Sequence, residues 1–220
     1  PSHQVDSARA PGVRFARSFA RIYDLKRSPE HIDAMSYEEG GQRHSAWYIL
    51  PRTKEDLRQM AYFDSLTGLP NRRLFTEQLS LLLRMSARSN GLLALLFLDL
   101  DNFKRINDSL GHLAGDVLLQ TLAQRLKQQL RGSDLVARFG GDEFLVLLPG
   151  RRPLADVQEV ASKMLTAVAA PLLLQGRPIS VTPSVGIALY PQHATTPSDL
   201  IRCADAAMYA AKQQGRATQR

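Results

Sequence analysis

The hydrophobic and polar positions of this chain follow two periods, and the pattern is regular from residue 61 onward. A nearly continuous apolar run at residues 92–98 predicts a strand that is buried on both faces. Apolar residues that recur every three or four positions predict helices over residues 72–88, 113–130, 154–170 and 198–214. Shorter apolar runs predict two hairpins and one further strand, over residues 135–138 with 144–148, 172–174 with 178–181, and 184–189. Strands that alternate with helices but include hairpins indicate an α/β (α+β) sandwich with a mixed, largely antiparallel sheet.

The first quarter of the chain lacks this regularity. The pair Gly40-Gly41 interrupts the pattern, and the apolar run at 46–50 is consistent with the last strand of an upstream domain. Residues 54–63 then have helical spacing. We therefore expect residues 1–58 to be the tail of an upstream sensor domain with a connector helix, and residues 59–220 to be the main domain. A helix that simply packs on the main domain fits the same spacing equally well.

Composition narrows the class of ligand and the compartment. There are 28 basic and 21 acidic residues, and the net charge of +7 favours anionic ligands. The basic residues form no block with interleaved aromatic residues, which argues against nucleic-acid binding. The single cysteine, Cys203, excludes an internal disulfide and favours a reducing, cytoplasmic environment.

No part of the sequence predicts membrane contact or export. No apolar run is long enough to cross a bilayer, and the first ten residues lack the pattern of a signal peptide. Because the sequence does not begin with Met, we expect it to be part of a longer protein, whose remainder could carry a membrane anchor.

Two carboxylates close the strand predicted at residues 92–98. Asp99 and Asp101 follow a buried apolar run, where ionised groups are costly unless a cation or hydrogen-bond donors compensate them. The strand period places both side chains on the same face. Carboxylates that act together with phosphates are the usual ligands of Mg²⁺. A pair of aspartates that caps a turn would explain these two residues equally well if they stood alone.

A second acidic motif lies in the hairpin predicted around residue 140. Gly140 and Gly141 permit a tight turn and close approach of a ligand, and Asp142 and Glu143 follow directly. A solvated hairpin tip is the competing interpretation, because Gly and Asp are common in turns. If this hairpin lies beside the strand that ends at Asp99, three or four carboxylates converge and require a divalent cation.

The segment between the two acidic motifs carries groups suited to a nucleotide. The loop after Asp101 enters a helical turn, whose free backbone N–H groups suit phosphate, and Lys104 adds positive charge. Asn107 and Asp116 offer a donor and an acceptor that suit a guanine edge. His112 is more often structural than catalytic in such a setting, and no Ser or Cys nucleophile has an evident base.

Four motifs together resemble the signature of GGDEF-domain diguanylate cyclases. They are residues 64–72 (DSLTGLPNR), 99–108 (DLDNFKRIND), 110–116 (LGHLAGD) and 140–144 (GGDEF). The resemblance covers about residues 60–216, and the order of the motifs makes it specific. It implies a fold like that of nucleotidyl cyclases and the polymerase palm, with a ferredoxin-like βαββαβ core and added hairpins. It also suggests the GGDEF part of a larger sensor-GGDEF or GGDEF-EAL protein.

The resemblance also implies roles for individual residues. Asp99, Asp142 and Glu143 would be catalytic, and Asp142 would accept a proton. Mg²⁺, with Mn²⁺ as an alternative, would be bound by Asp99, by Asp142 or Glu143, and by the main-chain carbonyl of Leu100. The implied substrate contacts are Asn107 and Asp116 to guanine, Lys104, Lys212, Arg216 and the N–H groups of Asn102 and Phe103 to phosphates, and Gly140 and Gly141 in the hairpin. Arg131 and Asp134 would form an inhibitory site for the product.

The implied activity is the condensation of two GTP molecules into cyclic di-GMP, with release of pyrophosphate. Each domain would hold one GTP, so that a two-fold homodimer is required and product feedback is expected. The alternative is a non-catalytic GGDEF module that binds GTP or cyclic di-GMP and regulates a neighbouring domain.

Overall fold

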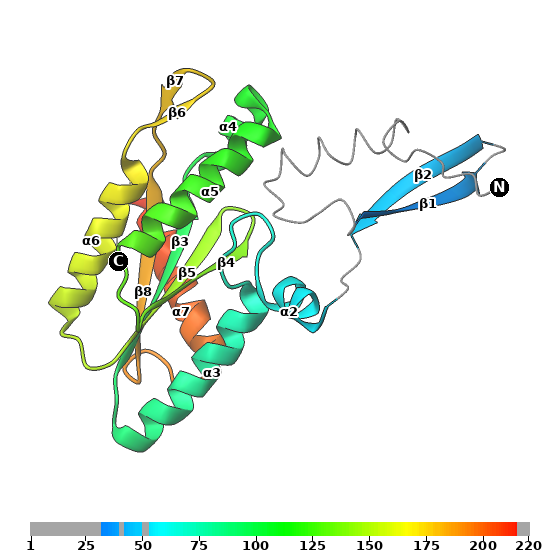
Figure 1. Cartoon of the computed structure of the whole chain (residues 1–220). Coiled ribbons are helices and arrows are strands. Elements are labelled where there is room, and N and C mark those ends of the chain that lie inside the picture. The colour runs from blue at the N-terminus through cyan, green and yellow to red at the C-terminus, as the bar shows by residue number, and fades with distance from the viewer. Residues whose placement is uncertain (1–31, 40–41, 50–52, 215–220) are drawn as a thin grey trace. The chain divides into compact units, whose positions relative to one another are not determined.

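The computed structural model describes residues 32–39, 42–49 and 53–214 (Figure 1). The described residues divide into two units at the bond between Met60 and Ala61. In the first unit, β1 (Ile32–Glu39) and β2 (Gln42–Ile49) form an antiparallel hairpin. The strand predicted near residue 46 is therefore present in β2. Its partner β1 was not predicted, because its polar and apolar residues are mixed.

A helix, α2 (Lys54–Tyr62), follows this hairpin along the chain, at the position where the sequence predicts a connector. Its start is set by Thr53 and Asp56, each of which accepts a hydrogen bond from the backbone N–H of the other. Leu57 and Met60 are more than half exposed, and no residue of α2 is buried.

The second unit is built on one four-stranded sheet in the order β4-β5-β3-β8. Its strands are β3 (Leu93–Leu100), β4 (Leu135–Gly140), β5 (Glu143–Pro149) and β8 (Pro183–Tyr190). Every pairing in the sheet is antiparallel, so the predicted largely antiparallel sheet is confirmed without a parallel pair among the described strands. The order of strands and helices is that of a ferredoxin-like βαββαβ core.

Helices cover both faces of this sheet (Figure 1). The elements outside the sheet are α3 (Arg72–Ser89), α4 (Phe103–Leu110), α5 (His112–Gln128), α6 (Leu154–Ala169), α7 (Pro197–Gln213) and a short hairpin of β6 (Leu172–Leu174) and β7 (Arg177–Ile179). In β3, Leu96 and Leu98 pack with α5 and α6, whereas Leu95 and Phe97 pack with α3 and α7. The alternation follows from the period of a strand that is buried on both faces.

A glycine in β8 lets α7 lie against the sheet. A Cβ added to Gly186 would overlap the backbone of α7 at Ala204 and Met208, so only glycine permits this approach. The close packing fixes the course of α7 and brings its last turn, with Lys212, beside the end of β3. Gly186 therefore positions a residue of the candidate site from a distance.

Candidate active site

The two acidic motifs meet on adjacent strands. Asp99 of β3 lies directly opposite Glu143 of β5 in the antiparallel register, so their side chains share one face of the sheet. The hairpin closes with a tight turn at Gly141 and Asp142, and Gly141 has a φ of +49° that favours glycine. The expected convergence of Asp99 with the hairpin carboxylates is present.

A lysine forms an ion pair with one of these carboxylates. The Nζ atom of Lys212, in the last turn of α7, is 2.5 Å from Oδ1 of Asp99, and both side chains are mostly buried. Lys212 was expected to contact phosphate, and it lies within the acidic cluster. Arg216, the second phosphate contact expected near this helix end, lies outside the described residues.

Burial and neighbouring negative charges raise the pKa of Asp99 and of Glu143. Burial is the main cause that raises the pKa of Asp99, and it outweighs the ion pair with Lys212, which lowers it. The pKa of Glu143 is raised first by burial and then by the negative charges of Asp99, Asp142 and Asp205. A bound cation would stabilise the ionised forms of these carboxylates.

The oxygen donors suit a divalent metal that phosphate helps to bind. Among the described residues, no three His, Cys, Asp or Glu side chains are grouped so that they would hold a metal ion by themselves. Mg²⁺ commonly binds to one or two carboxylates plus the phosphates of a substrate, and not to a cage made only of protein groups. Asp99 and Glu143 meet that pattern.

Two carboxylates have positions that sequence reasoning did not foresee. Asp101 was expected to join Asp99, but β3 ends at Leu100, and Asp101 is buried and bonded to the hydroxyl groups of Thr182 and Ser184. Those donors make it a structural group. Asp205 of α7, by contrast, is exposed and near enough to Glu143 to raise its pKa. The signal in the sequence is its spacing of two helical turns from Lys212.

The expected guanine-recognising residues come together where α4 meets α5. Oδ1 of Asn107 is buried and has no hydrogen-bond partner among the residues that the structure describes. Gly115 lies against this amide so closely that a side chain there would overlap Asn107, and Asp116 follows, partly exposed. A buried acceptor without a donor is costly, so this site is suited to a ligand that supplies an N–H group.

The expected phosphate-binding segment begins α4. Asn102 adopts a left-handed conformation with φ of +60°, and Phe103 starts the helix without a side-chain cap. Lys104 is exposed in the first turn. The first N–H groups of a helix without such a cap remain available to an anion, and their contact with phosphate stays a prediction.

The two residues of the expected inhibitory site, Arg131 and Asp134, differ in exposure. The Asp134 carboxylate is almost fully buried in an ion pair with Arg152 at 2.5 Å, and it also accepts the backbone N–H of Arg131. The side chain of Arg131 is exposed. Arg152 was not foreseen, because it lies 18 residues from its partner.

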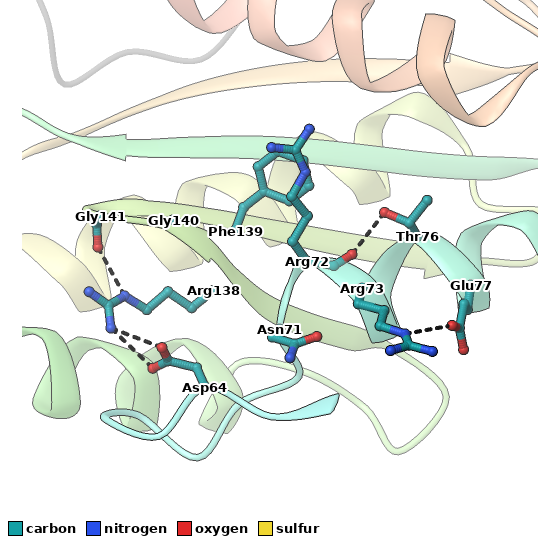
Figure 2. Close-up of a pocket in the computed structure, with 10 residues that line it drawn as sticks. All are labelled: Asp64, Asn71, Arg72, Arg73, Thr76, Glu77, Arg138, Phe139, Gly140 and Gly141. Carbon is teal, nitrogen blue, oxygen red and sulfur yellow. Dashed lines mark hydrogen bonds and ion pairs between the residues drawn. The ribbon is translucent and has the colours of Figure 1, made fainter. Parts of the chain in front are cut away.

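A hydrogen-bond network centred on Arg138 also supports the hairpin. Arg138 donates two hydrogen bonds of 3.1 Å to the Asp64 carboxylate and one of 2.9 Å to the carbonyl of Gly141 (Figure 2). Asp64 belongs to the first motif, at residues 64–72, whose turn it closes by accepting hydrogen bonds from Thr67. This network ties the first motif to the acidic hairpin.

The fold and the hairpin with two acids define the class of protein. The family described as diguanylate cyclase, GGDEF domain, matches residues 61–218. The chain therefore belongs to the GGDEF family.

Particular relatives agree with this assignment. The diguanylate cyclase TpbB of Pseudomonas aeruginosa strain UCBPP-PA14 is 49% identical over 165 residues, which are 74% of this chain and 38% of TpbB. A crystal structure of the TpbB GGDEF domain from Pseudomonas aeruginosa has a TM-score of 0.68, covering 70% of this chain and 96% of that one. The GGDEF domain of DgcB from Caulobacter crescentus in complex with c-di-GMP is 28% identical, with a TM-score of 0.68 over 72% of this chain and 94% of that one.

One relative carries a different activity in its name. The cyclic di-GMP phosphodiesterase NbdA of Pseudomonas aeruginosa is 43% identical over 168 residues, which are 76% of this chain and 21% of NbdA. The chain thus spans well under half the length of the curated relatives described here. In the part of the chain that the structure describes, no helix is both long and apolar enough to cross a membrane.

Glu143→Gln is expected to raise the melting temperature of the chain at neutral pH without metal or nucleotide. The folded state raises the pKa of Glu143, so ionised Glu143 favours the unfolded chain. The melting temperatures of the variant and wild type should diverge as the pH rises above the ordinary glutamate pKa. Below that pKa they should be equal, because Glu143 is then protonated in both the folded and the unfolded chain. Thermal unfolding in a chelator at several pH values measures this.

Glu159→Gln is the matched control for that experiment. The pKa of Glu159 is lowered by Lys163, so this exposed residue should give no gain in melting temperature. A melting temperature of Glu143→Gln at or below wild type at neutral pH would contradict the electrostatic description of the cluster.

Proposed function

We propose that this chain is a diguanylate cyclase that condenses two GTP molecules into cyclic di-GMP as a two-fold homodimer. The observation that carries the proposal is the buried amide oxygen of Asn107, which no donor among the described residues meets, in a domain that also places Asp99 opposite Glu143. The Asn107 amide suits guanine, and the two carboxylates suit the metal of a nucleoside triphosphate. Family membership supports the same substrate.

The proposed reaction is an in-line displacement at phosphorus. The 3′-hydroxyl oxygen of one GTP forms a bond to the α-phosphorus of the other, the bond to the β-phosphate oxygen breaks, and pyrophosphate leaves. The 3′-hydroxyl of the second nucleotide then attacks the α-phosphorus of the first in the same way, which closes the ring and releases the second pyrophosphate. Mg²⁺ or Mn²⁺, when bound, supplies charge that stabilises the transition state.

The residues of the chain then have separate tasks. Asn107 and Asp116 orient the guanine, and the N–H groups of Asn102 and Phe103 receive phosphate oxygens. Asp99 and Glu143 supply metal ligands. Asp142, at the tip of the hairpin, takes the hydroxyl proton. Lys104, Lys212 and Arg216 offset phosphate charge. The carbonyl of Leu100 is a further metal ligand, and Gly140 and Gly141 contact the substrate.

The direct test is turnover of GTP by this chain with Mg²⁺ or Mn²⁺. Chromatography of the nucleotides should show cyclic di-GMP, with two pyrophosphates formed for each molecule of product. Binding of GTP without product at any protein concentration would favour the second candidate, a non-catalytic module that regulates a neighbouring domain. The similarity to NbdA is the observation that favours this candidate.

The surroundings of the domain are proposed from the sequence as well. Residues 1–58 would be the tail of a sensor domain and its connector, followed by the GGDEF domain at 59–220, in the cytoplasm.

Arg131→Ala is expected to relieve inhibition by cyclic di-GMP and to leave the initial rate nearly unchanged. Arg131 is exposed, and its planar guanidinium suits phosphate and guanine edges. Progress curves with added cyclic di-GMP, compared with wild type, measure the relief. Wild type that binds no cyclic di-GMP in a calorimetric titration would refute the inhibitory site.

Asp134 is a poorer residue for this test. Removing one partner of a buried ion pair leaves Arg152 uncompensated, at a cost of about 3–5 kcal/mol. Asp134→Ala is thus expected to lower stability as well as product affinity.

A further inference from the structure

A cleft beside the acidic hairpin is lined by side chains that have no role in the proposed GTP site. Its volume is about 760 Å³, and it lies between the start of α3 and the end of β4 (Figure 2). Three arginines, Arg72, Arg73 and Arg138, line it together with Phe139 and the hairpin glycines. Most of the side chains that line the cleft are charged or polar, and the cleft is open to solvent, which suits an anionic group.

Two of these arginines are already neutralised. Arg138 is bonded through both oxygens of Asp64, and Arg73 pairs with Glu77 at 3.2 Å and also lies over the ring of Tyr62. The two carboxylates that line the cleft, Asp64 and Glu77, are therefore both in ion pairs.

Arg72 is different. Its guanidinium lies 4.5 Å from the centre of the Phe139 ring, and among the described residues no carboxylate pairs with it. Stacking uses the face of the guanidinium and leaves the N–H groups at its edge for an acceptor. Figure 2 shows Arg72 over Phe139, away from the two ion pairs.

The cleft shares a face of the sheet with the acidic cluster. Phe139 packs edge-on against Phe97 of β3, with ring centres 5.9 Å apart, and both belong to the apolar cluster under α3 and α7. Asp99 is the next residue of β3 on that face. Arg72 thus flanks the hairpin on the side where its acids lie, next to Gly140 and Gly141.

We propose that the Arg72 cleft binds a phosphate group of the GTP held by the second copy of the chain. This rests on the proposed function, in which two hairpins must meet with a nucleotide on each. Such an encounter brings a polyanion toward a surface that already carries Asp99, Asp142, Glu143 and Asp205. An unpaired arginine beside the hairpin offsets that repulsion, and its fork fits phosphate oxygens.

The test separates binding by one chain from binding across two chains. Arg72→Ala should leave the affinity of dilute, monomeric chain for a non-hydrolysable GTP analogue within about twofold of wild type, because Arg72 does not touch its own nucleotide. It should weaken dimerisation induced by the analogue, followed by sedimentation, by roughly 10- to 100-fold. Cyclic di-GMP formation should fall in proportion to the dimer that is lost.

Two control variants distinguish the phosphate contact of Arg72 from a general effect of positive charge. Arg73→Ala removes a neighbouring arginine that is already paired, and it should leave dimerisation and product formation near wild type. Arg72→Lys keeps the charge but loses the planar fork, and it should recover only part of the effect. Melting temperatures show that each variant is folded.

Three outcomes would overturn the inference. Arg72→Ala that dimerises and turns over like wild type would show that the cleft is not used. An equal loss of affinity in the monomer would place Arg72 at its own nucleotide. An effect shared by Arg73→Ala would show a general loss of positive charge. Wild type without product would instead refute the proposed function.

Discussion

Asp142→Ala is expected to lower cyclic di-GMP formation by roughly 10²- to 10⁴-fold, the contribution typical of a positioned acid or base. Asp142 lies in the two-residue turn of the hairpin, where its side chain supports no apolar packing. The loss should therefore appear in turnover and not in folding. Initial rates at saturating GTP and Mg²⁺, together with a thermal melt, measure both quantities.

The negative charge of Asp142 also raises the pKa of Asp99 and of Glu143. Removing it should therefore keep or increase the melting temperature of the metal-free chain. Asp156→Ala is the control, since Asp156 is an exposed acid in the first turn of α6, away from the hairpin. A variant Asp142→Ala that cyclises GTP near the wild-type rate would show that this acid takes no part in the chemistry.

The fold was largely predictable because its signals are local and repeated. The apolar run of β3 and the helical spacing of α3, α5, α6 and α7 each require burial of a defined face, and they lie within a few residues of the predicted bounds. The weaker elements were harder to predict. In α4 no residue is buried, and the sequence indicated only a helical turn there.

The site was predictable where the chemistry is contiguous in the chain. Asp142 and Glu143 follow a glycine pair, and the register with Asp99 follows once β3 and β5 are neighbours. Contacts made across the fold were not predictable. The ion pair of Asp134 with Arg152 depends on packing, and so does the hydroxyl cage around Asp101.

The last prediction concerns the number of chains that the reaction needs. In the proposed reaction one domain would present one nucleotide, so the attacking hydroxyl and the attacked phosphate would lie on different chains. While monomer dominates, dimer grows as the square of the concentration, and specific activity should rise in proportion to it. Halving the enzyme should then lower the total rate about fourfold by mass action. An upstream sensor that joined two chains would raise their effective concentration and flatten this dependence.

The same geometry predicts a failed complementation. A mixture of Asp142→Ala and Asn107→Ala chains should recover little activity, because one half of each mixed dimer lacks the acid that takes the proton and the other half lacks a guanine contact. The measurement is initial rate against enzyme concentration at saturating GTP and Mg²⁺, with light scattering on the same samples. Arg73→Ala chains, which keep both half-sites, should follow the wild-type curve. Specific activity that stays constant down to concentrations where scattering detects only monomer would refute a reaction between two chains, since a single chain would then form both phosphodiester bonds.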